Sequence, residues 1–407
     1  MSSENIISQL ADAIGSDALI TDPSEREYFS MDVFDIDQVA DLVFQPKSKN
    51  EISIALKILS ETDYQIIPRG GGMSYTSGYT PSTKRSVIVD TSLLNQILEI
   101  NPEDMYITVE AGCTWKAIYE ALRPMGMRLP FFGTNSGSMA TVGGGLSNGA
   151  LFFGTGKYGS AADNVLGMEV IIADGTLIKT GQNAFANSKP HHRTYGPDMT
   201  GLFCHDAGSL GIKVQATFPL IYWPKSIDYL SFAYKTLEDS VAALSSVSKS
   251  GLTEECYVLD PSSAGNLADV SNIEGAKSVM KVFKEQPSIA KGIKESFKMA
   301  FTGRSVIPDD AYSLHMVIAN HSQQALDYDL KAAITIAQNH NGESIPNTVP
   351  KATRADPFPP MNGILGHTGE RWAALNAKVP HSDALAVNQE IIKLMKKHKS
   401  RMDACGV

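Results

Sequence analysis

The chain has 407 residues, of which 43% are hydrophobic and 19% are charged, and its formal net charge is −9. This composition is typical of a soluble globular protein, and the length favours two domains because one hydrophobic core rarely serves so long a chain. The negative charge, without a long basic run, argues against nucleic acid as a partner and weakens any case for binding anionic lipid. No apolar run reaches the roughly 18 residues of a membrane span.

Cysteine usage and the start of the chain indicate the compartment. The four cysteines are widely scattered, without C-x-x-C pairs, so we expect reduced thiols. The opening residues, MSSENIISQLADAIG, lack a basic segment followed by an apolar one, and we therefore expect a cytoplasmic and not a secreted protein. The cysteines are Cys113, Cys204, Cys256 and Cys405.

From Asp37 to Tyr222, short β-rich runs alternate with helical stretches, which predicts a layered α+β or α/β domain. Asn50 and Thr114 are the expected N-caps of its two clearest helices. The helices are expected at 51–61 and 114–126, and the strands at 40–45, 65–68, 86–90, 105–112, 168–175 and 213–221.

The stretch IIPRGGGMSYTSG, Ile66 to Gly78, places three glycines between an apolar run and small hydroxyl residues. One interpretation is a turn that ends a strand. The other is an anion cradle, in which successive backbone N–H groups converge on a phosphate and nearby hydroxyls add donors. The motif alone does not decide between them.

A second region of glycine and small polar residues begins with TNSGS at 134–138 and continues with the triple glycine at 143–145. Two such loops that face each other would hold a pyrophosphate from both sides through N–H groups. Gly154, Gly156 and Gly159 have G-x-G-x-x-G spacing, but a strand follows within a few residues and leaves no room for the helix that a dinucleotide fingerprint requires. We therefore reject that match.

After Tyr222 a second α+β unit begins, with a strand expected at 227–235 and a helix at 236–251. We place this domain at 223–380. An amphipathic helix is expected to begin at an Asp383 cap within the last segment, 381–407. Nothing after this helix resembles a finished domain, so we expect a further C-terminal segment in the complete protein.

Five stretches in order resemble the flavoprotein superfamily named after vanillyl-alcohol oxidase and p-cresol methylhydroxylase, nearest its D-lactate and glycolate dehydrogenase branch. The resemblance implies an α+β fold: an FAD-binding domain of the p-cresol methylhydroxylase type at 1–222, with two subdomains split near 95–105, followed by an α+β cap domain that supplies the substrate pocket. The stretches are PRGGGMSYTSG (68–78), ILEINPEDMYITVEAGCTW (97–115), ATVGGGLSNG (140–149), KYGSAADNVLGMEVIIADG (157–175) and YGPDMTGLFCHDAGSLGI (195–212).

The resemblance also implies which residues hold FAD. The first loop would wrap the pyrophosphate, the second would contact it or the flavin side, and the last stretch would approach the adenine end. The candidates are Arg69, Gly70, Gly71, Gly72, Met73, Ser74, Gly78, Thr134, Gly137, Ser138, Thr141, Val142, Gly143, Asn148, Gly149, Tyr158, Gly159, Gly211 and Ile212.

Covalent attachment of FAD at the two sites used by some branches is excluded. Met73 stands where those branches carry the linking histidine, and no cysteine is present near Gly133 and Thr134. A link through the C-terminal part, as in the vanillyl-alcohol oxidase branch, stays open.

The implied chemistry is oxidation of the CH–OH group of a small 2-hydroxy acid, such as D-lactate or glycolate, by hydride transfer to flavin N5. A base and a carboxylate anchor are then needed, and the segment GILGHTGERW offers His367, Glu370 and Arg371. These three are equally consistent with a solvated surface. The alternatives are a phenolic or aromatic alcohol as substrate, or a flavin-binding electron-transfer subunit. The electron acceptor, oxygen or a redox partner, and the oligomeric state, a homodimer included, stay open.

Overall fold

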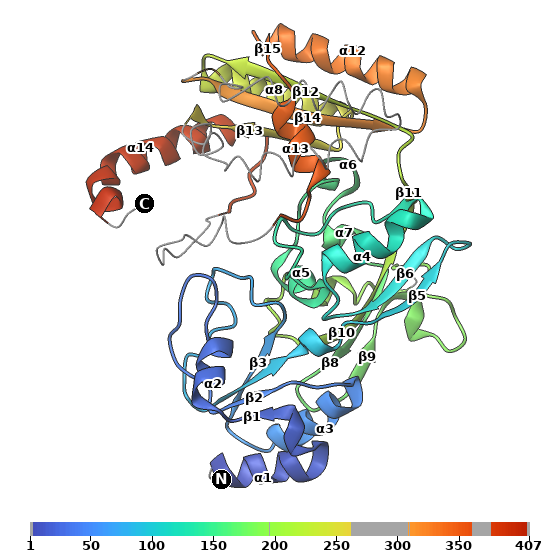
Figure 1. Cartoon of the computed structure of the whole chain (residues 1–407), viewed down its shortest axis with the longest axis vertical. Helices are drawn as coiled ribbons and strands as arrows, with labels where there is room; N and C mark the ends of the chain where they lie inside the picture. Colours follow the sequence, from blue (N-terminus) through green and yellow to red (C-terminus); the bar gives the residue numbers. More distant parts are fainter. Residues whose placement is uncertain (1–2, 195, 262–307, 309, 360–375, 405–407) are drawn as a thin grey trace. The chain divides into compact units, whose positions relative to one another are not determined.

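The computed structural model describes residues 3–194, 196–261, 308, 310–359 and 376–404. The chain divides into two compact units, coloured along the sequence in Figure 1. Unit 1 consists of residues 1–223 and 357–374, and unit 2 of residues 224–356 and 375–407. The described residues 357–359, which the sequence-based division placed in the second domain, belong to unit 1.

The first sheet of unit 1 has the strand order β1-β2-β4-β3, with β2, β4 and β3 parallel and β1 antiparallel to β2. Its helices pack Ile6, Leu10 and Leu56 against apolar strand residues. Each such fully buried side chain contributes about 1.5–3 kcal/mol by leaving water. The elements are α1 (Ser3–Ile14), β1 (Leu19–Ile20), α2 (Pro23–Ser30), β2 (Leu42–Phe44), α3 (Lys49–Leu59), β3 (Gln65–Arg69) and β4 (Ser86–Asp90).

The second sheet of unit 1 is antiparallel, with the order β5-β6-β10-β8-β9. Ile171, Ile212 and Val214 from this sheet belong to the same core as α1 and α3, so the two halves of unit 1 share buried residues. Its elements are β5 (Ile97–Asn101), β6 (Tyr106–Glu110), α4 (Trp115–Leu122), β7 (Met127–Arg128), α5 (Val142–Asn148), α6 (Thr155–Tyr158), α7 (Ala161–Asn164), β8 (Gly167–Ile171), β9 (Leu177–Lys179), β10 (Ile212–Pro219) and β11 (Ile221–Tyr222).

The first residues of α3 and α4 can be compared with the N-caps expected from the sequence. Thr114 caps α4 as predicted, since its side chain accepts a hydrogen bond from Ala117 N. Asn50 is not the cap of α3: Ser48 takes that place and accepts from Glu51 N at 3.3 Å. Glu51 also accepts from Lys47 N at 2.8 Å, and this reciprocal pairing moves the start of the helix two residues earlier.

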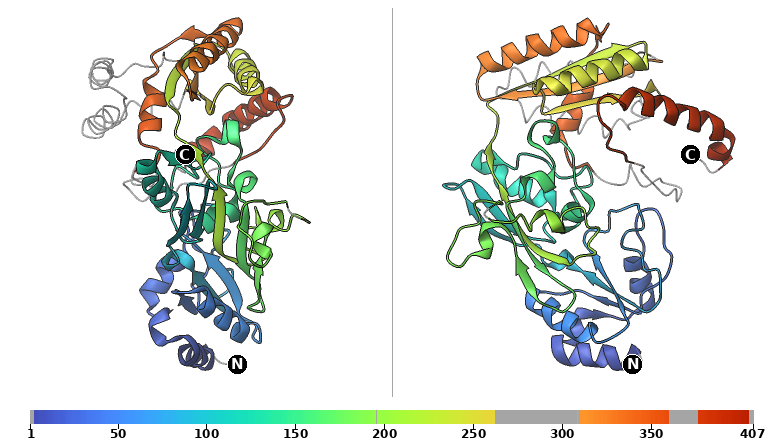
Figure 2. Two further views of the ribbon diagram at one scale, coloured as in Figure 1. Left: turned by 90° about the vertical axis from the view of Figure 1, so that its right-hand side faces the viewer. Right: turned by 180° about the vertical axis from the view of Figure 1, so that it is seen from behind.

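Unit 2 is built on an antiparallel sheet in the order β13-β14-β12-β15, and α8 and α12 lie together over one face of it (Figure 2). Along β14, Leu314, Met316 and Ile318 point into the core with these helices, while Ser313 and His315 point to the other face. The elements are β12 (Ser226–Tyr234), α8 (Leu237–Ser250), β13 (Glu255–Leu259), β14 (Tyr312–Asn320), α12 (Gln323–Asn339), β15 (Glu343–Ser344), α13 (Thr348–Ala355) and α14 (Ala384–Ala404).

Candidate functional site

Two glycine-rich loops of unit 1 touch each other. The first follows β3, and the second leads into α5. A Cβ added to Gly70 would lie 2.3 Å from Thr141 Oγ1, and one added to Gly71 would lie 1.9 Å from the carbonyl oxygen of Met139. Real Cβ atoms do not come this close to other atoms, so these positions require glycine.

The first loop presents a run of unused backbone donors. Within the described part of the chain, none of the N–H groups of residues 70–74 donates a hydrogen bond. In contrast, Val142 N donates to Cys113 O at 2.9 Å and Gly143 N to Ala111 O at 2.7 Å. Any contact from Val142 or Gly143 to a cofactor must therefore use other atoms, while the first loop has N–H groups available.

Asp32 holds the C-terminal end of the first loop in place through hydrogen bonds. Its carboxylate accepts hydrogen bonds from Ser77 N at 2.8 Å and from Phe34 N and Asp35 N at 2.8 and 2.7 Å. Val33 N also donates to Ser74 O at 2.9 Å. No local pattern indicates this role, because Asp32 lies 45 residues before Ser77 in a loop rich in acidic residues.

Arg69 lies at the base of the first loop. It is 8% exposed, its Nη1 lies 3.6 Å from Asp90 Oδ1, and the same nitrogen donates to Gly70 O at 3.3 Å. A Cβ on Gly72, whose φ is 69°, would lie 2.3 Å from Arg69 Nη2. Phe29 packs against the guanidinium at 4.9 Å. The buried Nε has no hydrogen-bond partner among the described residues.

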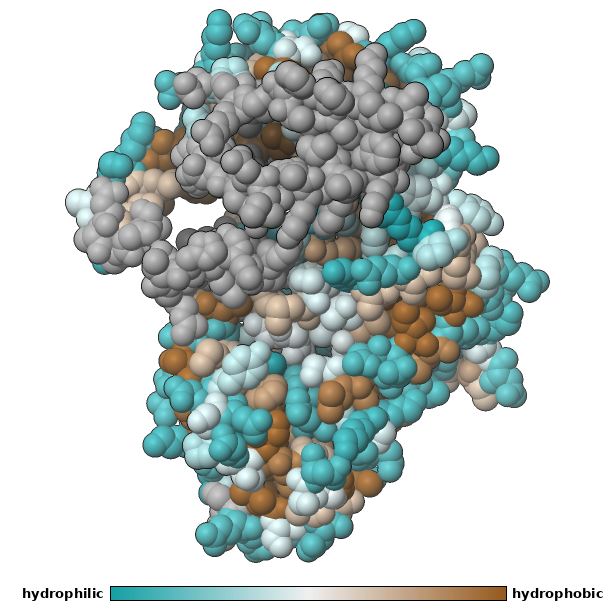
Figure 3. Space-filling view, in the orientation of Figure 1, coloured by the Kyte–Doolittle hydropathy of each residue, from teal (hydrophilic) through white to brown (hydrophobic). Residues whose placement is uncertain are grey.

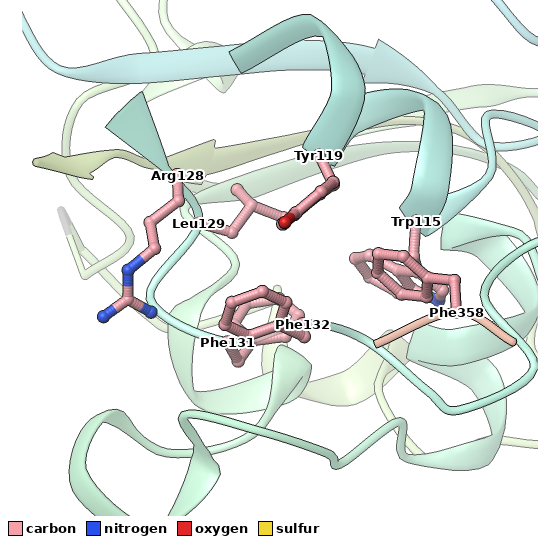
Figure 4. Close-up of a pocket in the computed structure, with 7 residues that line it drawn as sticks. All are labelled: Trp115, Tyr119, Arg128, Leu129, Phe131, Phe132 and Phe358. Carbon is pink, nitrogen blue, oxygen red and sulfur yellow. The ribbon is translucent and has the colours of Figure 1, made fainter. Parts of the chain in front are cut away.

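The indole ring of Trp115 packs against Gly133 and Gly145, at the two ends of the second loop. A Cβ on Gly133 or Gly145 would lie 2.2 or 2.5 Å from its indole ring, and its buried Nε1 has no partner in the described part of the chain. The ring borders a small aromatic pocket with a volume of about 10 Å³ (Figure 4). The residues that line it are Trp115, Tyr119, Arg128, Leu129, Phe131, Phe132 and Phe358.

Phe358 lines this pocket next to the second loop. Its ring meets Tyr119 edge-on at 5.6 Å, and a Cβ on Gly137 would lie 2.5 Å from its Cδ1. Gly137 N also donates to Thr134 O at 2.9 Å, which shapes the TNSGS turn. Gly137 thus leaves the room that Phe358 fills.

The loop after Phe203 packs on the end of α5. His205 N donates to Leu146 O at 2.9 Å, and a Cβ on Gly149 would lie 2.0 Å from the His205 ring. Next to it, Lys213 Nζ and Asp206 Oδ1 form an ion pair at 2.7 Å with both side chains 2% exposed. Burial lowers the pKa of Lys213, and its hydrogen bond to Asp206 opposes that shift. The sequence did not reveal this pair.

The remaining cofactor candidates have varied surroundings. Asn148 Nδ2 donates to Gly144 O at 3.2 Å, and Gly159, with φ of 86°, ends α6 beside the Ser160–Asp163 capping box. Ile212 is 3% exposed and lies in the shared core. Tyr158 contacts the Arg128 guanidinium at 5.6 Å. Short helices and β8 follow Gly154, which confirms the rejection of the dinucleotide fingerprint.

The candidate catalytic residues His367, Glu370 and Arg371 lie outside the described residues. In unit 2 the structure shows a buried histidine that the sequence did not indicate. His315 Nδ1 pairs with Ser231 Oγ at 2.9 Å and Nε2 with Ser313 Oγ at 3.0 Å. Burial lowers the pKa of His315 to about 4, so the ring is neutral at physiological pH.

The chemistry of the facing loops suits a pyrophosphate. Free N–H groups at 70–74, a buried Arg69 nitrogen without a partner and a bare-backbone cradle all favour a bound anion. The described residues hold no group of three or more His, Cys, Asp or Glu side chains arranged for a metal ion. None of the helices in the described ranges is both long and apolar enough to cross a bilayer.

This α+β fold and its glycine cradle suit a flavin-binding domain. A family model described as an FAD binding domain matches residues 40–181. The fold resembles p-cresol methylhydroxylase with substrate bound, at a TM-score of 0.69 and 17% identity over 89% of this chain and 70% of that one. It also resembles alkyldihydroxyacetonephosphate synthase, at a TM-score of 0.66 and 17% identity over 88% and 64%. Residues 40–181 therefore match an FAD-binding domain, as expected, and the fold is similar to that of p-cresol methylhydroxylase and alkyldihydroxyacetonephosphate synthase.

Curated relatives agree with this assignment. The chain is 28% identical to "D-lactate dehydrogenase [cytochrome] 1, mitochondrial" of Saccharomyces cerevisiae, over 52% of this chain and 35% of the relative. It is 31% identical to "Glycolate oxidase subunit GlcD" of Bacillus subtilis, over 51% of this chain and 42% of the relative. An Arabidopsis thaliana mitochondrial D-lactate dehydrogenase is 28% identical over 69% and 48%. The matched regions thus span about a third to a half of these relatives.

Proposed function

We propose that this chain is the flavin-binding part of an FAD-dependent oxidoreductase that oxidises the CH–OH group of a small 2-hydroxy acid such as D-lactate or glycolate. The observation that carries the proposal is the contact between the two glycine loops, with unused N–H groups at residues 70–74. The names of the relatives, D-lactate dehydrogenase and glycolate oxidase subunit, support this substrate class.

In this proposal the first loop donates hydrogen bonds to the pyrophosphate of FAD, and Arg69 adds positive charge beneath it. Thr134, Ser138 and Thr141 offer hydroxyl groups from the second loop. When bound, FAD supplies a two-electron acceptor for a hydride from the substrate carbon.

For binding and deprotonation of the substrate, we propose roles for residues of the second domain and of the segment at 360–375. His367 accepts the hydroxyl proton of the substrate, and Arg371 binds its carboxylate with a bidentate pair of hydrogen bonds. Glu370 stands between them in sequence and belongs to the same candidate set.

A phenolic or aromatic alcohol is the second candidate substrate, because a pocket lined by Trp115, Tyr119, Phe131, Phe132 and Phe358 adjoins the second loop. Aromatic rings of a ligand pack edge-on or offset against such side chains. The volume of this pocket is about 10 Å³, which is too small for an aromatic ring and so favours the hydroxy acid.

The test is anaerobic reduction of the FAD-loaded chain. We expect the visible flavin band to bleach with D-lactate or glycolate and to persist with aromatic alcohols. Bleaching by aromatic alcohols alone would support the second candidate. A flavin that dithionite reduces but no substrate of either class reduces would support an electron-transfer subunit instead.

A further inference from the structure

Helix α14 uses one side to pack on the rest of unit 2. It runs over 21 residues, and Gln389 Nε2 donates to Glu238 Oε1 on α8 at 2.9 Å. Ile392, Lys393 and Lys396 line a groove with the start of α8. The spacing of these four residues, i, i+3, i+4 and i+7, defines one side of a helix.

The opposite side of α14 is apolar and exposed. Ile391, Leu394 and Met395 are 47%, 48% and 50% exposed, and their i, i+3, i+4 spacing forms a stripe that Val387 extends. His398 lies on the same side and separates this stripe from Met402. In Figure 3, hydrophobic brown and tan atoms of α14 lie at the surface on the left, next to hydrophilic teal atoms. The stripe has no packing partner in the described part of unit 2.

Basic residues border this stripe. On a helical projection at 3.6 residues per turn, Lys397 and Arg401 fall along one edge and Lys399 along the other. Glu390 falls on the same edge as Lys397 and Arg401, and its carboxylate pairs with Lys393 at 3.2 Å. The end of α14 is therefore locally positive in a chain whose net charge is −9.

We propose that α14 binds the surface of an anionic lipid bilayer. An exposed apolar stripe flanked by Lys and Arg is the pattern of a helix that lies in the membrane interface, with its apolar side among the acyl chains and its cations at the headgroups. The charge of the whole chain does not prevent this contact, because salt screens fields beyond about 8–10 Å. This proposal differs from the expectation drawn from net charge alone.

Charge also favours lipid over a second copy of this chain. Two copies that paired in parallel through the stripe would bring Lys397 and Arg401 of each close to the same cations of the other, and like charges in contact oppose association. An anionic headgroup layer matches both edges of the stripe.

The experiment is co-sedimentation of the 407-residue chain with vesicles of phosphatidylcholine alone or of phosphatidylcholine with one quarter phosphatidylglycerol. We expect binding to the anionic vesicles that weakens as salt rises. Lys397→Glu with Arg401→Glu, and separately Leu394→Gln with Met395→Gln, should each reduce the partition coefficient by about tenfold or more. The matched control, Lys249→Glu with Lys331→Glu, makes the same charge change on α8 and α12 and should reduce it far less.

Hydrogen exchange gives a second, local measurement that does not depend on any variant. Anionic vesicles should slow amide exchange in residues 384–404. The proposal is overturned if the chain does not sediment with anionic vesicles, or if both α14 variants bind as the control does. It is also overturned if the chain is a dimer that the Leu394→Gln and Met395→Gln pair converts to a monomer, because a second copy would then cover the stripe.

Discussion

The hydroxyl oxygen of Thr141 lies 2.3 Å from the point where a side chain at Gly70 would begin. Thr141 is also the N-cap of α5, where its Oγ1 accepts a hydrogen bond from Gly144 N at 3.4 Å. The residue that starts the helix of the second loop is thus the residue that limits the first loop to glycine. This contact joins the two halves of the proposed pyrophosphate site.

Substitution of Gly71 should weaken FAD binding, because the loop has no room for a side chain at this position. A Cβ there would meet the Met139 carbonyl oxygen at 1.9 Å, and backbone atoms cannot move aside as a flexible side chain can. We expect Gly71→Ala to weaken FAD binding by about tenfold or more and to lower the free energy of unfolding by about 1–3 kcal/mol. Flavin fluorescence titration and thermal unfolding measure the two effects.

Gly126→Ala is the matched control for this substitution. Gly126 has a φ of 67° and nothing within 4 Å of its missing Cβ. The change should cost about 1 kcal/mol of stability through backbone strain alone and leave FAD affinity unchanged. Equal loss of FAD in both variants would contradict the role of the loop contact.

Arg69 and Asp90 should be coupled in stability. Arg69→Leu leaves the Asp90 carboxylate, which is 0% exposed, without its cation, although Gln45 and Ser92 still donate to Oδ2 at 2.7 Å each. We expect a loss of about 3–5 kcal/mol. The further change Asp90→Asn should recover part of it, and the double-mutant cycle measures the coupling. Additive losses would show that the two side chains do not interact.

His315 should make unfolding depend on pH. Burial holds its pKa at about 4 in the folded chain, below the unfolded value of 6.5. Between these values the unfolded state binds more protons, so stability is full above about pH 6.5 and is lost as the pH falls toward 4, by up to about 3 kcal/mol. Chemical denaturation across this range should show the slope in wild type and lose it in His315→Gln.

The exposed His321 supplies the comparison for that experiment. His321→Gln should keep the wild-type slope between pH 6.5 and 4. A slope that is the same in wild type and His315→Gln would assign the pH dependence to other groups.

The sequence predicted those parts of the structure that depend on local pattern. The glycine loops, the Thr114 cap and the strand that becomes β12 all have signals within a few residues. The buried pairs could not be predicted, because they depend on strand register: Arg69 stands opposite Asp90 across β3 and β4, and Ser231 stands opposite His315 across β12 and β14. Register is set by packing, which a local pattern does not reveal.

The helix start at Ser48 shows the same limit on a smaller scale. Ser48 and Asn50 are both good N-cap residues, and the choice between them rests on Glu51, whose carboxylate reaches back to Lys47 N at 2.8 Å. For the candidate site, sequence similarity indicated the cofactor loops but not Asp32, which holds the first loop in place.

The most direct test of the pyrophosphate site is a titration of the apoprotein with FAD, ADP and riboflavin, followed by isothermal calorimetry. If the loop contact between Gly70 and Thr141 forms a pyrophosphate clamp, FAD binds, ADP competes with it, and riboflavin, which lacks phosphate, binds at least about a hundredfold more weakly than FAD. Riboflavin that binds as tightly as FAD, together with ADP that does not compete, would contradict the account.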